Sequence, residues 1–129
     1  MQTFPTPEVY VAQSAIHGRG VFAARDFTPG EIIEYAHAVR VPASEQPFLD
    51  QTVLYNYYFT WNGDNAIVLG NGSIYNHSYA PNARYDKEFA TNTLIIVCIA
   101  PIRAHEEITV NYNGDPANTS PVWFDKGNA

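Results

Sequence analysis

The chain has 129 residues, of which 46% are hydrophobic and 16% charged, and its formal net charge is −6. This length and composition suit one folded domain and exclude a disordered tail. Thirteen acidic residues against seven lysines and arginines argue against binding to nucleic-acid phosphates and favour a basic partner. No run approaches the roughly 18 to 20 apolar residues of a membrane span, and the N-terminus lacks a secretory pattern, so we expect a cytoplasmic protein.

Short segments rich in β-branched and aromatic residues predict a mainly β fold. In chain order, the predicted strands are Val9–Val11, Gly20–Phe22, Glu31–Val41, Tyr57–Trp61, Ala66–Leu69, Thr93–Ile99 and Ile108–Tyr112. Tight turns are predicted at Thr28–Glu31, Asn62–Asn65 and Ala90–Asn92. Little helix is expected, and the best candidate is a turn or two within Glu45–Asn56.

A glycine pair near the start of the chain is the first candidate for a binding site. In Gly18-Arg19-Gly20 the missing side chains let a ligand approach the backbone and its amide donors. A plain turn between two strands is the commoner explanation of such a pair. No helix is predicted after it, as a dinucleotide-binding fingerprint would require.

Two later segments also carry polar chemistry. Segment 76–82 is polar and turn-forming but lies between apolar stretches, and its Asn76 and His77 can satisfy buried backbone groups or bind a polar ligand. Both interpretations stay open on these residues alone. Segment 106–112 alternates polar and apolar residues, as an amphipathic edge strand does, and ends at Tyr112.

The order and spacing of these three segments together resemble the SET domain of protein lysine methyltransferases. The matching residues are Gly18-x-Gly20, Asn76-His77-Ser78-x-x-Pro81-Asn82 and Glu107-Ile108-Thr109-Val110-x-Tyr112. The resemblance covers nearly the whole chain and is closest to the minimal single-domain forms of viruses and bacteria. It departs at Tyr79, where the family often has Cys, and at His105, where glycine is usual but where His tolerates a positive φ. The cysteine-rich segment that follows many nuclear members is also lacking.

The resemblance implies a SET fold (a β-clip) of several short curved sheets with little helix. In this fold the segments that contain Asn76 and Tyr112 pass each other as a C-terminal pseudoknot. The single domain, 1–129, would then comprise an N-terminal SET segment 9–41, a variable insert 42–65, a C-terminal SET segment 66–115 and an aromatic tail 116–129.

The implied reaction transfers a methyl group from S-adenosylmethionine to the ε-amine of a protein lysine, without a metal, and leaves S-adenosylhomocysteine. The match gives catalysis to Tyr112, Tyr35 and Tyr85. It gives cofactor binding to Ile16, His17, Gly18, Arg19, Gly20, Asn76, His77 and Tyr112. An aromatic lysine channel would be lined by Tyr35, Tyr75, Tyr85, Tyr112, Trp123 and Phe124, although the last two could equally anchor the C-terminus in the core.

The expected partner is a lysine-containing protein, basic or histone-like, with no direct contact to nucleic acid or membrane. A homodimer is a further option, because minimal relatives can pair to complete the site, and delivery to a host nucleus is the alternative compartment. Two competing hypotheses remain open. The chain could be a catalytically inactive SET-fold module that binds peptides, or a sugar-binding aromatic surface on an unrelated β fold.

The cysteine and histidines do not indicate a metal site. Cys98 is the only cysteine and lies in an apolar run, so we expect a buried, inert thiol and no disulfide. His17, His37, His77 and His105 lack the spacing of metal ligands. We therefore expect no bound metal.

Overall fold

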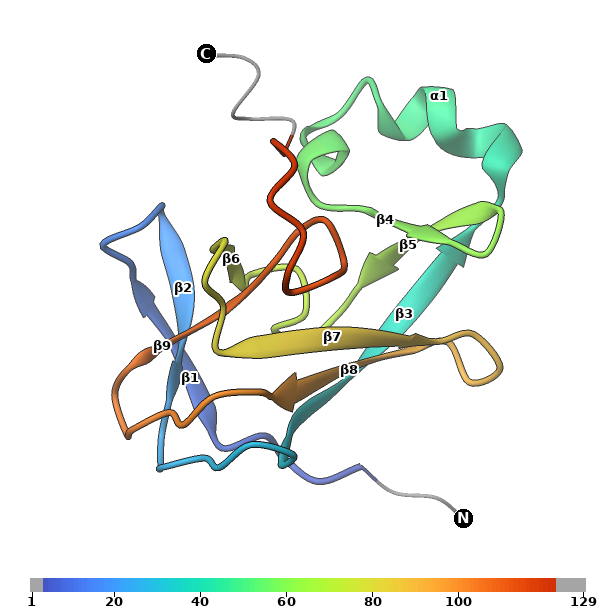
Figure 1. Ribbon diagram of the computed structural model, residues 1–129. Coiled ribbons are helices and arrows are strands. Elements are labelled where there is room, and N and C mark those ends of the chain that lie inside the picture. Colours follow the sequence, from blue (N-terminus) through green and yellow to red (C-terminus); the bar gives the residue numbers. More distant parts are fainter. Residues whose placement is uncertain (1–3, 123–129) are drawn as a thin grey trace.

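The computed structural model describes residues 4–122 and is mainly β, with several curved sheets, as the sequence predicts (Figure 1). The strands are β1 Val9–Gln13, β2 Arg19–Ala23, β3 Ile32–Val41, β4 Phe59–Trp61, β5 Asp64–Val68, β6 Asn76–His77, β7 Ala83–Glu88, β8 Thr93–Cys98 and β9 Glu107–Val110. All seven predicted strands are present with shifted ends. The two-residue strand β6 and the six-residue strand β7 are not predicted by the sequence.

Helix is confined to the insert between β3 and β4. It consists of the 3₁₀ turns η1 Ala43–Glu45 and η2 Val53–Asn56 on either side of the single-turn helix α1 Gln46–Leu49. This confirms the helical turn or two predicted within Glu45–Asn56. Within residues 4–122, no helix is long and apolar enough to cross a membrane.

The strands form two sheets. The first has the order β1-β2-β9-β6, and the second has the order β4-β5-β3-β8-β7. The long strand β3 is central to the second sheet, because it pairs with β8 along its first half and with β5 along its second half. Strand β7 of the second sheet contacts β9 of the first sheet, so the two sheets meet along these strands (Figure 1).

A parallel pairing of β6 with β9 joins two distant parts of the chain. Asn76 lies opposite Thr109 and His77 opposite Val110. The side chain of Asn82 fastens this crossing from one side, because its amide Nδ2 donates to the Glu107 carbonyl at 2.9 Å and its Oδ1 accepts from the Thr109 amide at 2.8 Å. The predicted crossing of the Asn76 and Tyr112 segments therefore brings them side by side.

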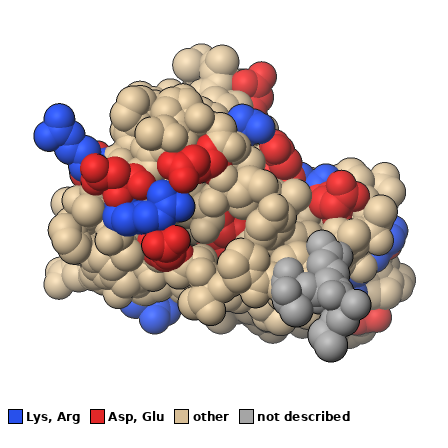
Figure 2. Space-filling model, turned by 90° about the horizontal axis from the view of Figure 1, so that it is seen from below, with Lys and Arg blue, Asp and Glu red and all other residues tan. Residues whose placement is uncertain are grey.

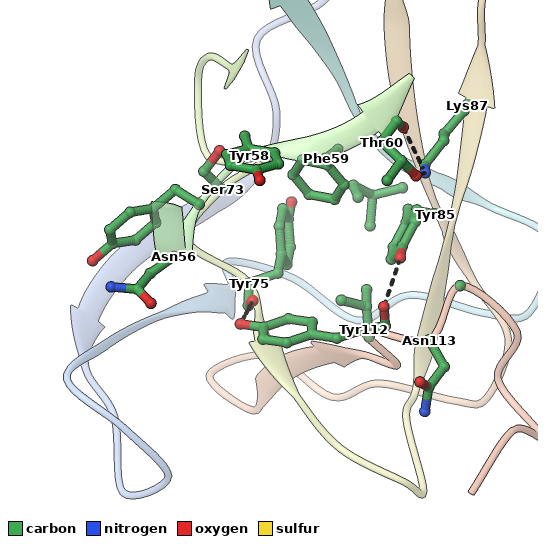
Figure 3. A pocket seen from close by; sticks show the side chains of 15 residues that line it. Asn56, Tyr58, Phe59, Thr60, Ser73, Tyr75, Tyr85, Lys87, Tyr112 and Asn113 are labelled. Atoms are coloured by element: carbon green, nitrogen blue, oxygen red, sulfur yellow. Dashed lines mark hydrogen bonds between the residues drawn. The ribbon is translucent and has the colours of Figure 1, made fainter. Parts of the chain in front are cut away.

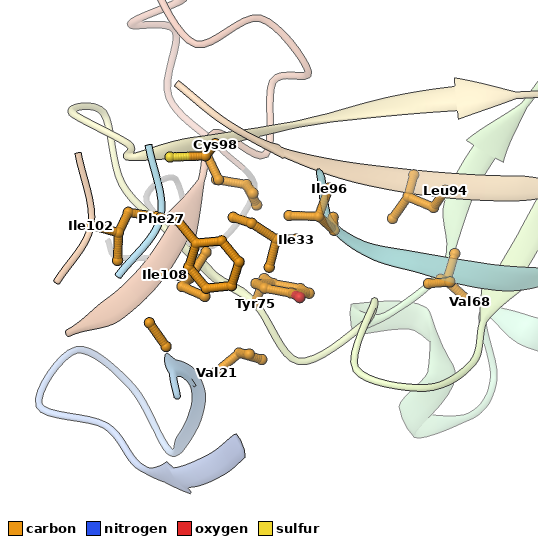
Figure 4. Close-up of a cluster of buried hydrophobic side chains, with 14 of the residues drawn as sticks. Val21, Phe27, Ile33, Val68, Tyr75, Leu94, Ile96, Cys98, Ile102 and Ile108 are labelled. Atoms are coloured by element: carbon orange, nitrogen blue, oxygen red, sulfur yellow. The ribbon is translucent and has the colours of Figure 1, made fainter. Parts of the chain in front are cut away.

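One apolar core lies between the sheets (Figure 4). Its largest fully buried side chains include Trp61, Tyr75, Phe27, Leu94, Ile96, Ile102 and Ile108. Cys98 is also fully buried, and its thiol donates to the Ala100 carbonyl, which agrees with the inert thiol that we expect. Tyr75 reaches both this core and the site described below.

The predicted turns are confirmed by backbone conformation. Asn62 and Gly63 have φ values of 47° and 89° and join β4 to β5, where Trp61 pairs with Asp64. Two consecutive positive φ values match the right-handed twist of the flanking strands. His105 has a φ of 72°, so it adopts the left-handed conformation expected at a position where glycine is usual.

Charged side chains are mixed on the surface. Figure 2 shows Lys and Arg interleaved with Asp and Glu on one face of the molecule, without a continuous basic patch on that face. Arg25, for example, pairs with both Glu8 and Glu31 at 3.1 Å. This face therefore does not offer the basic stripe that binds nucleic-acid phosphates.

Candidate active site

A pocket of about 280 Å³ opens where β4, β7 and the segment after β9 meet (Figure 3). Its aromatic lining residues are Tyr57, Tyr58, Phe59, Tyr75, Tyr85 and Tyr112. Ile96 and Val110 add apolar surface. A pocket with such walls suits an alkyl chain that ends in a cationic group, because aromatic faces attract cations and pack on methylenes.

Tyr112 is held at this pocket from both its backbone and its ring. It follows β9, and its amide donates to His77 Nδ1 at 3.0 Å. Its hydroxyl donates to the Tyr75 carbonyl at 2.7 Å (Figure 3). Since the proton of the hydroxyl is donated to that carbonyl, the Tyr112 oxygen can interact with a ligand only as an acceptor.

Tyr85 forms the neighbouring wall of the pocket. Its hydroxyl donates to the Tyr112 carbonyl at 3.3 Å, and its ring stands edge-on to Phe59. Burial raises the pKa of both Tyr85 and Tyr112 to about 12. Both phenols are therefore protonated near neutral pH and cannot act as bases there.

Tyr75 is anchored underneath the pocket by a buried carboxylate. Glu34 is 4% exposed and accepts from the Tyr75 hydroxyl at 2.6 Å and from the Asn71 amide at 3.0 Å. Burial raises the pKa of Tyr75 well above its usual value, and the nearby Glu34 charge adds to the shift. Because the Tyr75 carbonyl receives the Tyr112 hydroxyl, Glu34 indirectly fixes the position of Tyr112.

A second part of the candidate site is the loop 14–19, whose backbone is held by Asn76. The Asn76 amide Nδ2 lies 3.0 Å from the His17 carbonyl, 3.1 Å from the Arg19 carbonyl and 2.8 Å from Glu107 Oε2. On the other side, Ser14 Oγ accepts from the Ile16 amide and donates to Glu107 Oε1. The loop that the sequence assigns to cofactor binding is thus fixed directly to β6 and β9.

Gly18 of this loop and Gly20, which follows it in β2, have different surroundings. Gly18 has a φ of 46°, and a side chain there would meet no atom within 4 Å, so its backbone is open to a ligand. A Cβ on Gly20 would lie 2.2 Å from Glu107 Oε2 and 3.0 Å from Asn76 Nδ2. The space beside Gly20 is therefore filled by protein, and this glycine permits the close approach of those two side chains.

The loop otherwise has the character that an amino-acid ligand requires. Ile16, His17 and Arg19 are exposed beside Gly18, so one guanidinium is accessible next to the open Gly18 backbone. Guanidinium and backbone amides are suitable partners for a carboxylate. These residues could hold the methionine part of S-adenosylmethionine, the cofactor that the resemblance implies.

His77 follows Asn76, which holds the loop 14–19, and contacts Tyr112 of the pocket. Its Nδ1 accepts from the Tyr112 amide, which places the proton of a neutral imidazole on Nε2. Its ring contacts Tyr79 at 4.3 Å and Tyr112 at 5.2 Å between centroids. In this structure the His77 side chain thus positions Tyr112, a role that is additional to the cofactor role that the sequence assigns to it.

Some predicted site residues do not lie in the pocket. Tyr35 is next to Glu34 on β3 and therefore points to the other face of the strand. It lines a separate hollow with Pro5 and Pro7, and its ring contacts Phe4. The structure thus does not bring Tyr35 to Tyr112. Trp123 and Phe124, predicted to line the channel, lie outside the described residues.

The structure also places residues in the pocket that the sequence did not single out. The sequence predicts Tyr57 and Tyr58 only as the start of a strand, and no sequence pattern singles out Lys87, yet all three line the pocket. Lys87 is two positions after Tyr85 on β7, so both side chains share one face. That spacing is the sequence signal for Lys87 in the pocket, but it can be used only once residues 83–88 are recognised as a strand.

Among the described residues, no cluster of three or more His, Cys, Asp or Glu could hold a metal ion.

The fold and these motifs define the chain as a member of the SET domain family. The SET domain family model matches residues 18–113, which include Gly18 and Gly20, the β6 segment and Tyr112.

Relatives agree with this assignment. A Schizosaccharomyces pombe protein described as a histone-lysine N-methyltransferase specific for histone H3 lysine 37 is 31% identical over 110 residues, which are 84% of this chain and 71% of the relative. A crystal structure described as that of a candidate histone methyltransferase of Plasmodium falciparum superposes with a TM-score of 0.72 at 27% identity. The superposition covers 93% of this chain and 99% of that chain.

Proposed function

We propose that the chain is an S-adenosylmethionine-dependent protein-lysine methyltransferase that acts on a lysine of a protein, such as a histone-like tail. Membership of the SET family and the two histone methyltransferase relatives support methyl transfer to lysine as the reaction class. Tyr112 carries the proposal, because it follows β9, whose Glu107 holds the loop 14–19, and it also lines the tyrosine-walled pocket.

The pocket favours the reactive form of a lysine. Only a neutral amine can attack, and at neutral pH roughly one free lysine in a thousand is deprotonated. Removing an amine from water disfavours its charged form. The rings of Tyr85 and Phe59 and the apolar Ile96 provide that environment.

Tyr112 orients the amine. The Tyr112 hydroxyl donates its own proton to the Tyr75 carbonyl, and its oxygen accepts a hydrogen bond from an N–H of the amine. This hydrogen bond directs the nitrogen lone pair toward the methyl group. With a pKa of about 12, Tyr112 does not remove the amine proton, and the substrate loses that proton to water before the transfer.

The cofactor side would be held by the exposed loop around Gly18, with Arg19 facing its carboxylate and Asn76 keeping the loop in place. When bound, S-adenosylmethionine supplies a sulfonium methyl, so that the amine lone pair forms the new N–C bond while the C–S electron pair stays on sulfur. The positive charge thereby passes to the methylated amine. Nearby aromatic faces stabilise that charge.

Cofactor binding and methyl incorporation test this proposal together. Calorimetry should detect binding of S-adenosylmethionine to the purified protein. Lysates supplemented with histones and incubated with isotopically labelled cofactor should show labelled lysines by mass spectrometry. Tyr112→Phe should lower turnover by about 10²-fold, because it removes one preorganised hydrogen-bonding group.

Tyr10→Phe is the matched control. Tyr10 lies on β1, is exposed and also loses one hydroxyl hydrogen bond, in this case to His105, when changed to Phe. This variant should retain turnover. Cofactor binding without any labelled lysine would favour an inactive peptide-binding module, and absence of cofactor binding at millimolar concentration would overturn the proposal.

A further inference from the structure

Lys87 is the one formally charged side chain among the described residues that line the tyrosine-walled pocket. Its ammonium donates to the Thr60 carbonyl at 2.8 Å and lies 3.0 Å from Thr60 Oγ1 (Figure 3). It also lies 6.0 Å from the centre of the Tyr85 ring. Lys87 is therefore held in one place on the pocket wall, with Tyr85 between it and Tyr112.

The Lys87 ammonium lacks a carboxylate partner in the part of the chain that the structure describes. The four ion pairs found there involve arginines alone. An ammonium has three donors, and Thr60 supplies two acceptors. Partial burial lowers the pKa of Lys87, so an incoming anion would relieve the cost of its desolvation.

Resting on the proposed function, we infer that Lys87 is a specificity-determining residue that pairs with an acidic side chain of the substrate, close in sequence to the target lysine. A carboxylate would take the third ammonium donor in a charge-assisted hydrogen bond. Because Thr60 already fixes the ammonium, little side-chain freedom is lost on pairing. A lysine or arginine at the same substrate position would meet like charge.

The geometry also limits where that acidic residue lies. Lys87 is two residues beyond Tyr85 on β7, a rise of about 6.6 Å along the strand. Tyr85 in turn contacts the Tyr112 carbonyl. An extended substrate has the same rise per residue, so the acidic side chain would lie within about two or three positions of the target lysine.

This local preference is compatible with a basic substrate overall. The net charge of −6 attracts a basic protein at long range, whereas Lys87 acts only on the residue that enters the pocket beside it. The substrate class is therefore a protein segment in which an Asp or Glu lies near the modified lysine, even where the whole protein is basic.

The test uses a protein labelled in the lysate experiment. Each position within three residues of its methylated lysine is changed to Glu, Gln or Lys, and kcat/KM is measured for the wild-type enzyme, Lys87→Glu and Lys87→Met. At one position the wild type should prefer Glu over Lys by about tenfold. Lys87→Glu should reverse the preference, and Lys87→Met, which keeps most of the aliphatic stem, should abolish it.

Arg84→Glu is the matched control. Arg84 lies on the same strand but on the other face, where it pairs with Asp86, and its replacement changes the net charge equally. It should keep the preference of the wild type. Labelling without charge preference at any position, or a preference that survives in Lys87→Glu and Lys87→Met, overturns this inference alone. Absence of any labelled lysine overturns the proposed function and this inference with it.

Discussion

The hydroxyl of Tyr112 is committed to the Tyr75 carbonyl, and this determines what its oxygen can do. A phenol that donates its proton inside the protein presents an acceptor to the ligand. The carboxylate of Glu34, buried below Tyr75, keeps that carbonyl in place. In the proposed mechanism, the orientation of the amine would therefore depend on two linked hydrogen bonds that begin in the core, from Tyr75 to Glu34 and from Tyr112 to Tyr75.

The pH dependence of turnover should follow the substrate lysine and not the pocket tyrosines. Burial raises the pKa of Tyr85 and Tyr112 to about 12, so both stay protonated up to about pH 10. The neutral fraction of a lysine with a pKa near 10.4 rises about tenfold per pH unit between pH 7 and 9. kcat/KM for the protein substrate should rise in parallel over that range.

The measurement requires that cofactor affinity be followed at each pH, so that weaker cofactor binding is not mistaken for slower transfer. A plateau of kcat/KM below pH 8.5 at constant cofactor affinity would contradict this expectation. It would mean that a protein group with a lower pKa controls the reaction.

At the scale of single elements, the β4–β5 hairpin depends on the backbone conformation of Gly63 and not on the space around it. Gly63 has a φ of 89°, and a Cβ there would meet no atom within 4 Å. Gly63→Ala should therefore destabilise the fold through backbone strain alone, by about 1 to 2 kcal/mol. Urea unfolding, with the slope of the transition unchanged, measures this difference.

The neighbouring residue provides the comparison. Asn62 has a φ of 47°, which Asn tolerates, so Asn62→Gly should change the free energy of unfolding by less than about 0.5 kcal/mol. Equal effects of the two substitutions would show that strain at Gly63 does not account for the turn.

The strands that the sequence failed to predict share a physical cause. β6 has two residues and exists because β9 lies beside it, so no local pattern specifies it. β7 reads Ala-Arg-Tyr-Asp-Lys-Glu, and four charged residues obscure its alternation. It is an edge strand of the second sheet, where charged residues are common because they discourage edge-to-edge association.

Whole-molecule stability should decrease at alkaline pH. Tyr85 and Tyr112 have a pKa of about 12 when folded and about 10 when unfolded. Between these values the folded state binds more protons than the unfolded state, so the free energy of unfolding falls as pH rises. The contribution is complete below pH 10 and is lost toward pH 12, on the order of 2 kcal/mol for each tyrosine.

Urea titrations between pH 9 and 11.5 measure this loss. Tyr85→Phe cannot ionise at that position and should show a shallower decline than the wild type. Identical declines for the two proteins would mean that Tyr85 ionises as readily in the fold as in the unfolded chain.

The sequence predicted the architecture better than the details of the site. The mainly β fold and the tight turns are confirmed, because β-branched and aromatic segments and turn residues report on them directly. The meeting of Asn76 with the Tyr112 segment is confirmed as well, but it was implied by the resemblance to the SET family and not by any local pattern. Tyr35 matched a family position but faces a different hollow, since neighbouring residues on a strand point to opposite sides. The place of Lys87 in the pocket could not be predicted, because it depends on the pairing of β7 with β8.

The position of β9 between β2 and β6 has a consequence for how the protein is made. On the ribosome, β2 emerges early but has one free edge until residues 107–110 follow it out of the exit tunnel. Ser14 of the loop 14–19 and Asn76 can form their hydrogen bonds to Glu107 only at that same time. A nascent chain therefore acquires both halves of the site together and late, and until then it presents an open sheet edge that a chaperone can recognise.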